Sequence, residues 1–183
     1  MRLFDAPAAG FDHPLEILEA CHGRVLRFAG LTVRIARQVA ASGVDDEVRE
    51  AARSVMRYFD DAGAKHHRDE EEDLFPALNR CVPDSERPAL AALVTRLLDE
   101  HRELDGLWRA MREHLQALVE GRETALDPGL AEAFVEAYRR HIELEERELF
   151  PLARRLLDGK SIRVLGASMA QRRGVAPHLT PPL

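Results

Sequence analysis

Two segments of the sequence repeat the pattern H-x-x-x-E-E-x-x-L-F-P, and each copy places a histidine four residues before a glutamate. The copies begin at His66 and His141. Residues four apart lie one turn apart on the same face of a helix, so His66 with Glu70, and His141 with Glu145, can each point at one object. Each pair could therefore chelate one ion or part of a bridged pair of ions.

Two further histidines fall within apolar stripes of helical spacing. His22 continues the apolar series of Leu18 towards Val25, and His101 lies midway between Leu97 and Leu104. Both histidines therefore belong to faces that point at a core. At comparable depth in an antiparallel bundle, the inward-facing candidate metal ligands would converge near its middle: His22, His66, Glu70, His101, His141 and Glu145.

The chemistry of this set favours a metal centre. A carboxylate in an apolar core costs several kcal/mol unless it is paired, hydrogen-bonded or bound to metal, and two neighbouring carboxylates repel each other. A pair of cations removes both problems. Imidazole and carboxylate ligands suit iron, manganese or zinc, and iron is preferred because bridging carboxylates in helix bundles hold redox-active iron pairs. A single H-x-x-x-E is usually a solvated pair, whereas two copies in one repeated string are far more specific.

We interpret the other polar residues near these positions as structural residues and not as metal ligands. His67 lies one position after a predicted ligand, about 100° round the helix, and is expected to face solvent or the bundle edge. His114 is expected on the face opposite its apolar stripe, and Cys21 is expected to be buried and inert. Glu71 and Glu146 are expected on solvated faces, with a hydrogen bond to a ligand histidine as the alternative.

The composition indicates a globular protein. The 183 residues are 45% hydrophobic and 32% charged, which suits one domain with amphipathic elements. The net charge is 26 − 32 = −6 without a basic block, so nucleic acid and membrane surfaces are not expected partners. The two cysteines do not form a disulfide framework, and neither a secretory signal nor a membrane-length apolar run is visible, so we expect a cytoplasmic protein.

Apolar residues recur at helical spacing nearly everywhere, which predicts an all-α fold. We expect an up-down-up-down antiparallel four-helix bundle with a short fifth C-terminal helix. Residues 1–173 should form one domain and 174–183 a flexible tail. Pro76 should kink or tighten the end of the second helix, and Ser161 should cap the fifth. The predicted helices run from about Pro14 to Ser42, Asp46 to Asn79, Ser85 to Glu120, Pro128 to Leu157 and Ser161 to Arg173.

The order H, H-x-x-x-E, H, H-x-x-x-E over roughly residues 12–157 resembles the hemerythrin-like (HHE cation-binding) family. The ferritin-like alternative would show E-x-x-H pairs and lone glutamates. The resemblance implies a non-haem centre of two iron ions, with Glu70 and Glu145 bridging the irons, the four histidines capping them and a bridging oxo or hydroxo group between them.

Oxygen-carrying hemerythrins have a second histidine four residues after the third-helix ligand and an aspartate in the last helix, where this chain has Asp105 and Glu145. About two of twelve coordination positions are then open, unless Asp105 is an extra ligand. The resemblance therefore implies a protein that binds or senses oxygen, nitric oxide or peroxide.

Whether the protein is an enzyme stays open. The alternative function is a di-iron enzyme of the oxidative or nitrosative stress response, which consumes peroxide or nitric oxide or repairs iron centres. Related repair proteins carry a cysteine-bearing N-terminal domain, for which there is no length before His22. A third interpretation is an iron-responsive interaction protein. A monomer or a small homo-oligomer is expected.

Overall fold

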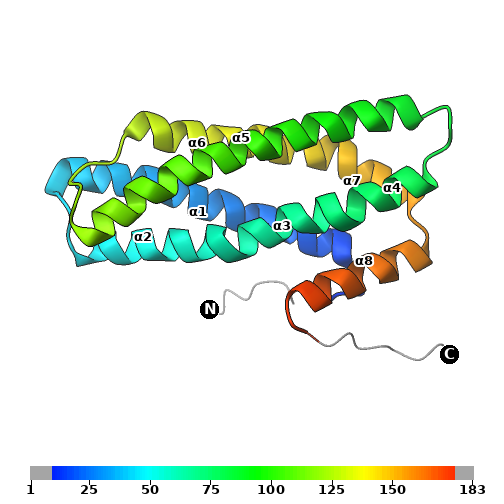
Figure 1. Cartoon of the computed structure of the whole chain (residues 1–183), viewed down its shortest axis with the longest axis horizontal. Helices are drawn as coiled ribbons and strands as arrows, with labels where there is room; N and C mark the ends of the chain where they lie inside the picture. The colour runs from blue at the N-terminus through cyan, green and yellow to red at the C-terminus, as the bar shows by residue number, and fades with distance from the viewer. Residues whose placement is uncertain (1–9, 176–183) are drawn as a thin grey trace, which may run out of the picture.

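The computed structural model describes residues 10–175, and every regular element in that range is helical. The long helical segments lie side by side, and a shorter helix packs near one end of the bundle (Figure 1). The prediction of an all-α fold is confirmed. No helix within the described part of the chain is long and apolar enough to cross a membrane.

The first rod is the uninterrupted helix α1 (Pro14–Ser42), and the third is α5 (Arg87–Glu120). The second and fourth rods contain short π-helical segments, labelled η. The second rod consists of α2 (Asp46–Tyr58), η1 (Phe59–Gly63), α3 (Ala64–Arg68), η2 (Asp69–Leu74) and α4 (Phe75–Cys81). The fourth consists of α6 (Pro128–Leu144), η3 (Glu145–Leu149) and α7 (Phe150–Leu156), and α8 (Gly159–Arg172) follows it.

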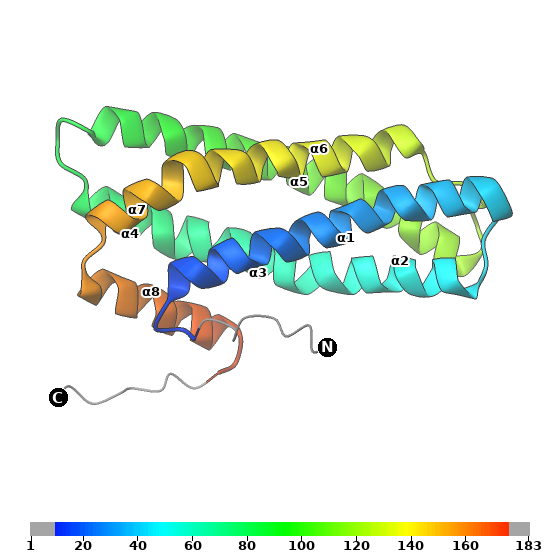
Figure 2. The ribbon, with the colours of Figure 1, turned by 180° about the vertical axis from the view of Figure 1, so that it is seen from behind.

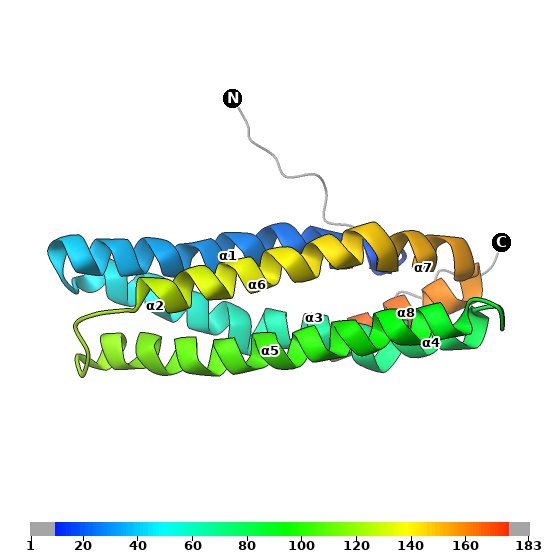
Figure 3. The same cartoon turned by 90° about the horizontal axis from the view of Figure 1, so that it is seen from above.

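Each rod packs against at least two others. The first rod contacts the second and the fourth, and α5 contacts α2 and α6. Figure 3 shows α1 beside α6, with α5 along the lower side of the bundle. Figure 2 shows α8 beside the first turns of α1 at the end of the bundle where the chain enters. This arrangement encloses one shared interior between the four rods.

Side-chain caps fix several helix starts. Asp45 accepts a hydrogen bond from the Val48 amide, and Asp127 accepts one from the Gly129 amide, both at 2.8 Å. These caps satisfy amide groups that have no partner within the helix. The expectation that Ser161 caps the fifth helix is wrong, because Asp158 accepts from the Ser161 amide and α8 starts at Gly159.

The π-helical segments η2 and η3 are the main departure from the predicted helices. Each is followed, after one phenylalanine, by a proline, Pro76 or Pro151. A proline lacks the amide hydrogen, and its ring clashes with the carbonyl four residues earlier. A wider turn before the proline accommodates both effects, and the helix then continues. The turn before Pro76 is therefore wider rather than tighter, and the rod runs on to Cys81.

The core consists of two apolar clusters with a polar layer between them. Along α1, Leu18 belongs to the cluster near the N-terminal end of α1, and Val25 belongs to the cluster at the other end. His22 lies between them and is buried. The polar layer is formed largely by buried histidines and acidic residues of all four rods. The predicted tail, residues 174–183, lies mostly outside the described residues.

Candidate metal centre

The six side chains predicted as metal ligands come together inside the bundle, and none is more than 3% exposed. They form two groups in which one nitrogen or oxygen atom of each residue lies within 4.8 Å of the others. Both groups contain Glu70 and Glu145. The first group adds His22 and His66, and the second adds His101 and His141.

The two oxygens of Glu145 face different histidines. Oε2 lies 3.1 Å from His22 Nε2, and Oε1 lies 3.0 Å from His141 Nε2. This carboxylate therefore extends between the two groups, with one oxygen directed at each.

Glu70 has the same arrangement. Its Oε1 lies 3.5 Å from His66 Nε2, and its Oε2 lies 3.4 Å from His101 Nε2. The two glutamates thus lie as a pair of bridges between the histidines of the first group and those of the second.

These separations suit ligands that share an ion. With bonds of about 2.1 Å, two ligands of one metal are about 3.0 Å apart at a right angle and about 3.4 Å apart at a tetrahedral angle. All four oxygens of Glu70 and Glu145, with His22 Nε2 and His66 Nδ1, are buried without a hydrogen-bond partner among residues 10–175. Because unpartnered buried polar atoms are rare and costly, a bound cation explains this cluster better than packing does.

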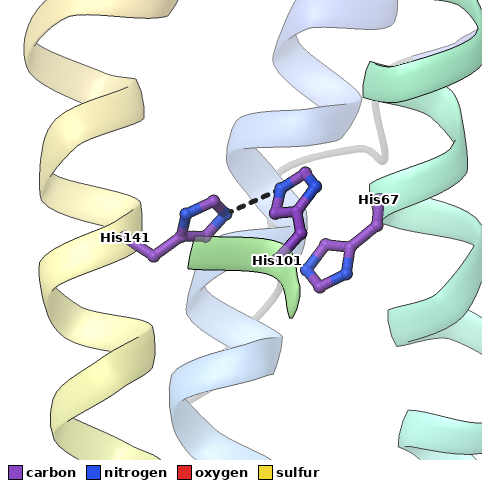
Figure 4. A group of neighbouring side chains, drawn as sticks. All are labelled: His67, His101 and His141. Carbon is purple, nitrogen blue, oxygen red and sulfur yellow. Dashed lines mark hydrogen bonds between the residues drawn. The ribbon is translucent and has the colours of Figure 1, made fainter. Parts of the chain in front are cut away.

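The histidines of the second group also face each other. His101 Nε2 lies 3.2 Å from His141 Nε2, although the two residues are 40 positions apart in the chain (Figure 4). Two imidazole nitrogens at this distance fit the same ion.

Acidic residues outside the two groups orient the lone histidines. His22 Nδ1 donates to Glu146 Oε1 at 2.9 Å, and His101 Nδ1 donates to Glu71 Oε1 at 2.6 Å. The proton on Nδ1 leaves the lone pair of Nε2 free to bind metal. Glu71 and Glu146 are exposed, as expected, but each also forms the hydrogen bond to a ligand histidine that the sequence left as the alternative.

A third such contact involves Glu100, which the sequence analysis did not single out. Its Oε2 accepts from His141 Nδ1 at 3.2 Å across the interface of α5 and α6. The repeated glutamate pairs signal Glu71 and Glu146, but no local spacing signals Glu100, because its partner is 41 residues away.

Burial and neighbouring charges shift the pKa values of the buried histidines and glutamates in different directions. Burial, reinforced by the charge of Glu145, raises the pKa of Glu70 well above its usual value. Burial also opposes ionisation of Glu145, but the imidazoles of His141 and His22 outweigh it and hold its pKa well below the usual value. Burial lowers the pKa of His66 to about 3. The pKa of His141 is raised to about 9, because the carboxylates of Glu145 and Glu100 together outweigh its burial.

The expectation that His67 faces solvent or the bundle edge is wrong. Its side chain is only 12% exposed, and its ring stacks on the ring of His101 with centroids 4.0 Å apart. Burial lowers the pKa of His67 well below its usual value, so the ring is neutral at pH 7. His67, His101 and His141 form a third group of nitrogen atoms within 4.8 Å of one another.

Other residues weighed in the sequence lie away from the candidate ligands. Asp105 is 66% exposed and belongs to none of the three groups. Cys21 is buried, and its Sγ accepts from Arg24 at 3.0 Å. His114 is half-exposed, and its Nδ1 lies within hydrogen-bond distance of Glu123 Oε2, at 2.8 Å.

Comparison with known proteins agrees with this geometry. Residues 13–153 match the family described as the Hemerythrin HHE cation binding domain. An uncharacterised protein of Haemophilus influenzae is 31% identical over 167 residues, which cover 91% of this chain and 94% of that protein. The chain therefore belongs to the hemerythrin HHE cation-binding domain family, and its bundle is a metal-binding domain.

Proposed function

We propose that this protein holds a bridged pair of iron ions and binds or senses oxygen, nitric oxide or peroxide. The observation that carries the proposal is that two histidine pairs share two glutamates, each of which directs one oxygen at either pair. A single ion would not need all four carboxylate oxygens turned in two directions.

The residues divide naturally between the two ions. His22 and His66 would hold the first ion, His101 and His141 would hold the second, and both glutamates would bridge them. A shared oxo or hydroxo group would complete the bridge. Each of the four rods contributes at least one ligand, so the folded bundle sets the separation of the ions in advance.

The donor set supports iron. Imidazole and carboxylate ligands without thiolate suit iron, manganese or zinc, and carboxylate-bridged pairs in helix bundles are a known setting for redox-active iron. When bound, such a pair supplies open coordination positions and one-electron chemistry for small molecules. The ligands are buried between two apolar clusters, which favours diatomic molecules and peroxide over larger substrates.

The proposal is tested by loading the protein with ferrous iron under argon and titrating it separately with oxygen, nitric oxide and hydrogen peroxide. We expect a saturable change in the visible spectrum with at least one of them, reversed when that ligand is removed. Glu145→Gln should abolish the change, whereas Glu143→Gln, at an exposed position, should retain it.

Repeated consumption of peroxide or nitric oxide over many turnovers would overturn the binding or sensing proposal and favour the enzyme. No spectral response to any of the three would overturn both.

A further inference from the structure

Two adjacent carboxylates at the start of η2, those of Asp69 and Glu70, are fully buried but have different surroundings. Glu70 directs one oxygen at each histidine group of the candidate metal centre. Asp69 faces α8 instead: its Oδ1 pairs with Arg172, and its Oδ2 lies 2.6 Å from Nη2 of Arg173. A single peptide bond therefore connects a candidate metal ligand to a residue held by α8.

The contact between α8 and η2 is a cluster of ion pairs. Nη2 of Arg172 also lies 2.8 Å from Asp73 and 2.9 Å from Glu72, so two arginines meet three acidic residues. Within the described part of the chain, both ion-pair partners of Asp69 belong to the end of α8. A buried charge that loses its partners is strongly destabilised. Asp69 therefore keeps its buried position only while α8 is docked.

The second copy of the repeated sequence pattern lacks this link. The position of Asp69, immediately before the glutamate, is taken there by Leu144. Leu144 is buried in an apolar cluster. A leucine thus fills this position when packing alone is needed, so the buried aspartate of the first copy calls for a different reason. The cluster of ion pairs with α8 supplies one.

α8 also has apolar anchors of its own. Leu165 and Met169 are buried in the cluster that contains Leu18 of α1. Figure 1 shows α8 alongside the end of the second rod, and α8 contacts η2 there. Because apolar contacts also hold α8 on the bundle, a change of one charge in the cluster should leave the helix in place.

We propose that Arg172 and Arg173 position Glu70 for metal binding by holding Asp69. This inference rests on the proposed iron pair. With Asp69 held, the backbone of η2 is fixed and Glu70 is presented to both histidine groups before a metal arrives. Coupling between two sites is reciprocal, so metal bound to Glu70 fixes the same backbone and strengthens the docking of α8.

The test measures iron affinity and the mobility of α8 separately. Ferrous iron is titrated under argon against a competing chelator, in variants whose circular dichroism shows a folded bundle. Asp69→Asn should weaken iron binding by about tenfold, the lower end of the cost of losing a residue that orients a ligand. Arg163→Gln, at an exposed position of the same helix, should bind iron as the wild type does. Hydrogen exchange measured by mass spectrometry should be slower in α8 after iron is added to the wild type, but not in Asp69→Asn.

Because Asp69→Asn could fail to fold, the exchange experiment on the wild type tests the inference independently. Hydrogen exchange in α8 that is the same with and without bound iron overturns the inference alone. A folded Asp69→Asn variant that binds iron as tightly as the wild type also overturns it, since Asp69 would then serve stability only. A wild type that takes up no iron overturns the proposed function, and this inference with it.

Discussion

Replacing Glu70 by methionine should stabilise the metal-free protein and destabilise the metal-loaded one. Glu70 is fully buried, and neither of its oxygens has a hydrogen-bond partner within residues 10–175. A buried unsatisfied polar group costs about 1–3 kcal/mol. Methionine has a similar length and adapts to irregular space, so it removes this cost without leaving a cavity.

The size of the effect follows from the length of the chain. A domain of 183 residues changes its Tm by about 2–4 °C per kcal/mol, so a gain of about 2 kcal/mol raises the metal-free Tm by about 4–8 °C. In the wild type, free metal at about 100 times its Kd adds about 2.7 kcal/mol, which is about 5–11 °C. Glu70→Met loses a bridging ligand, so metal adds little to its Tm.

Differential scanning calorimetry with chelator, and then with ferrous iron under argon, measures both quantities. The two proteins should exchange rank between the two conditions. Glu143→Met, at an exposed position, should follow the wild type in both. A metal-free Glu70→Met protein that is less stable than the wild type would refute the reasoning, because Glu70 would then be satisfied within the metal-free fold.

Three other predictions address the ligands, the protons and α8. His101→Ala should lose metal and the metal-dependent rise in Tm, whereas His114→Ala should lose neither, as metal analysis and calorimetry will show. Because the pKa of His141 is raised to about 9, its imidazole carries a proton at pH 7 that a metal must displace, and the raised pKa of Glu70 acts in the same direction. Metal uptake should therefore release protons and weaken as the pH falls. Calorimetric titrations in buffers of different ionisation enthalpy count these protons. Arg172→Ala should lower the free energy of unfolding by about 1–3 kcal/mol in urea denaturation, because it removes an ion pair between α8 and a buried carboxylate of η2.

The helices and the six candidate ligands could be predicted because their signals are local. Apolar spacing and caps such as Asp45 and Asp127 mark helix faces and starts. His66 with Glu70, and His141 with Glu145, are each four residues apart. The side chains of each pair still lie on one side of the rod although π-helical segments begin close to both glutamates. The repeated H-x-x-x-E-E-x-x-L-F-P pattern made the prediction of a metal site specific.

His67 and Glu100 could not be predicted because their environments depend on contacts between rods. Whether His67 is exposed or buried depends on how far its helix is rotated about its axis. A rotation of about 50° is enough to turn both His66 and His67 towards the interior of the bundle. Glu100 meets His141 only because α5 and α6 pack side by side. The π-helical segments η2 and η3 likewise depend on how the chain accommodates Pro76 and Pro151, and the periodicity of the sequence does not reveal this.

The most direct test of the central claim is the number of iron ions bound per chain and whether they are coupled. Protein purified without oxygen, loaded with ferrous iron and then oxidised should contain about two irons per chain, with magnetic susceptibility showing antiferromagnetic coupling through the shared bridges. About one iron per chain, or two without coupling, would contradict the bridged pair. A folded protein that takes up no iron would show that the buried histidines and glutamates form a polar network with another purpose.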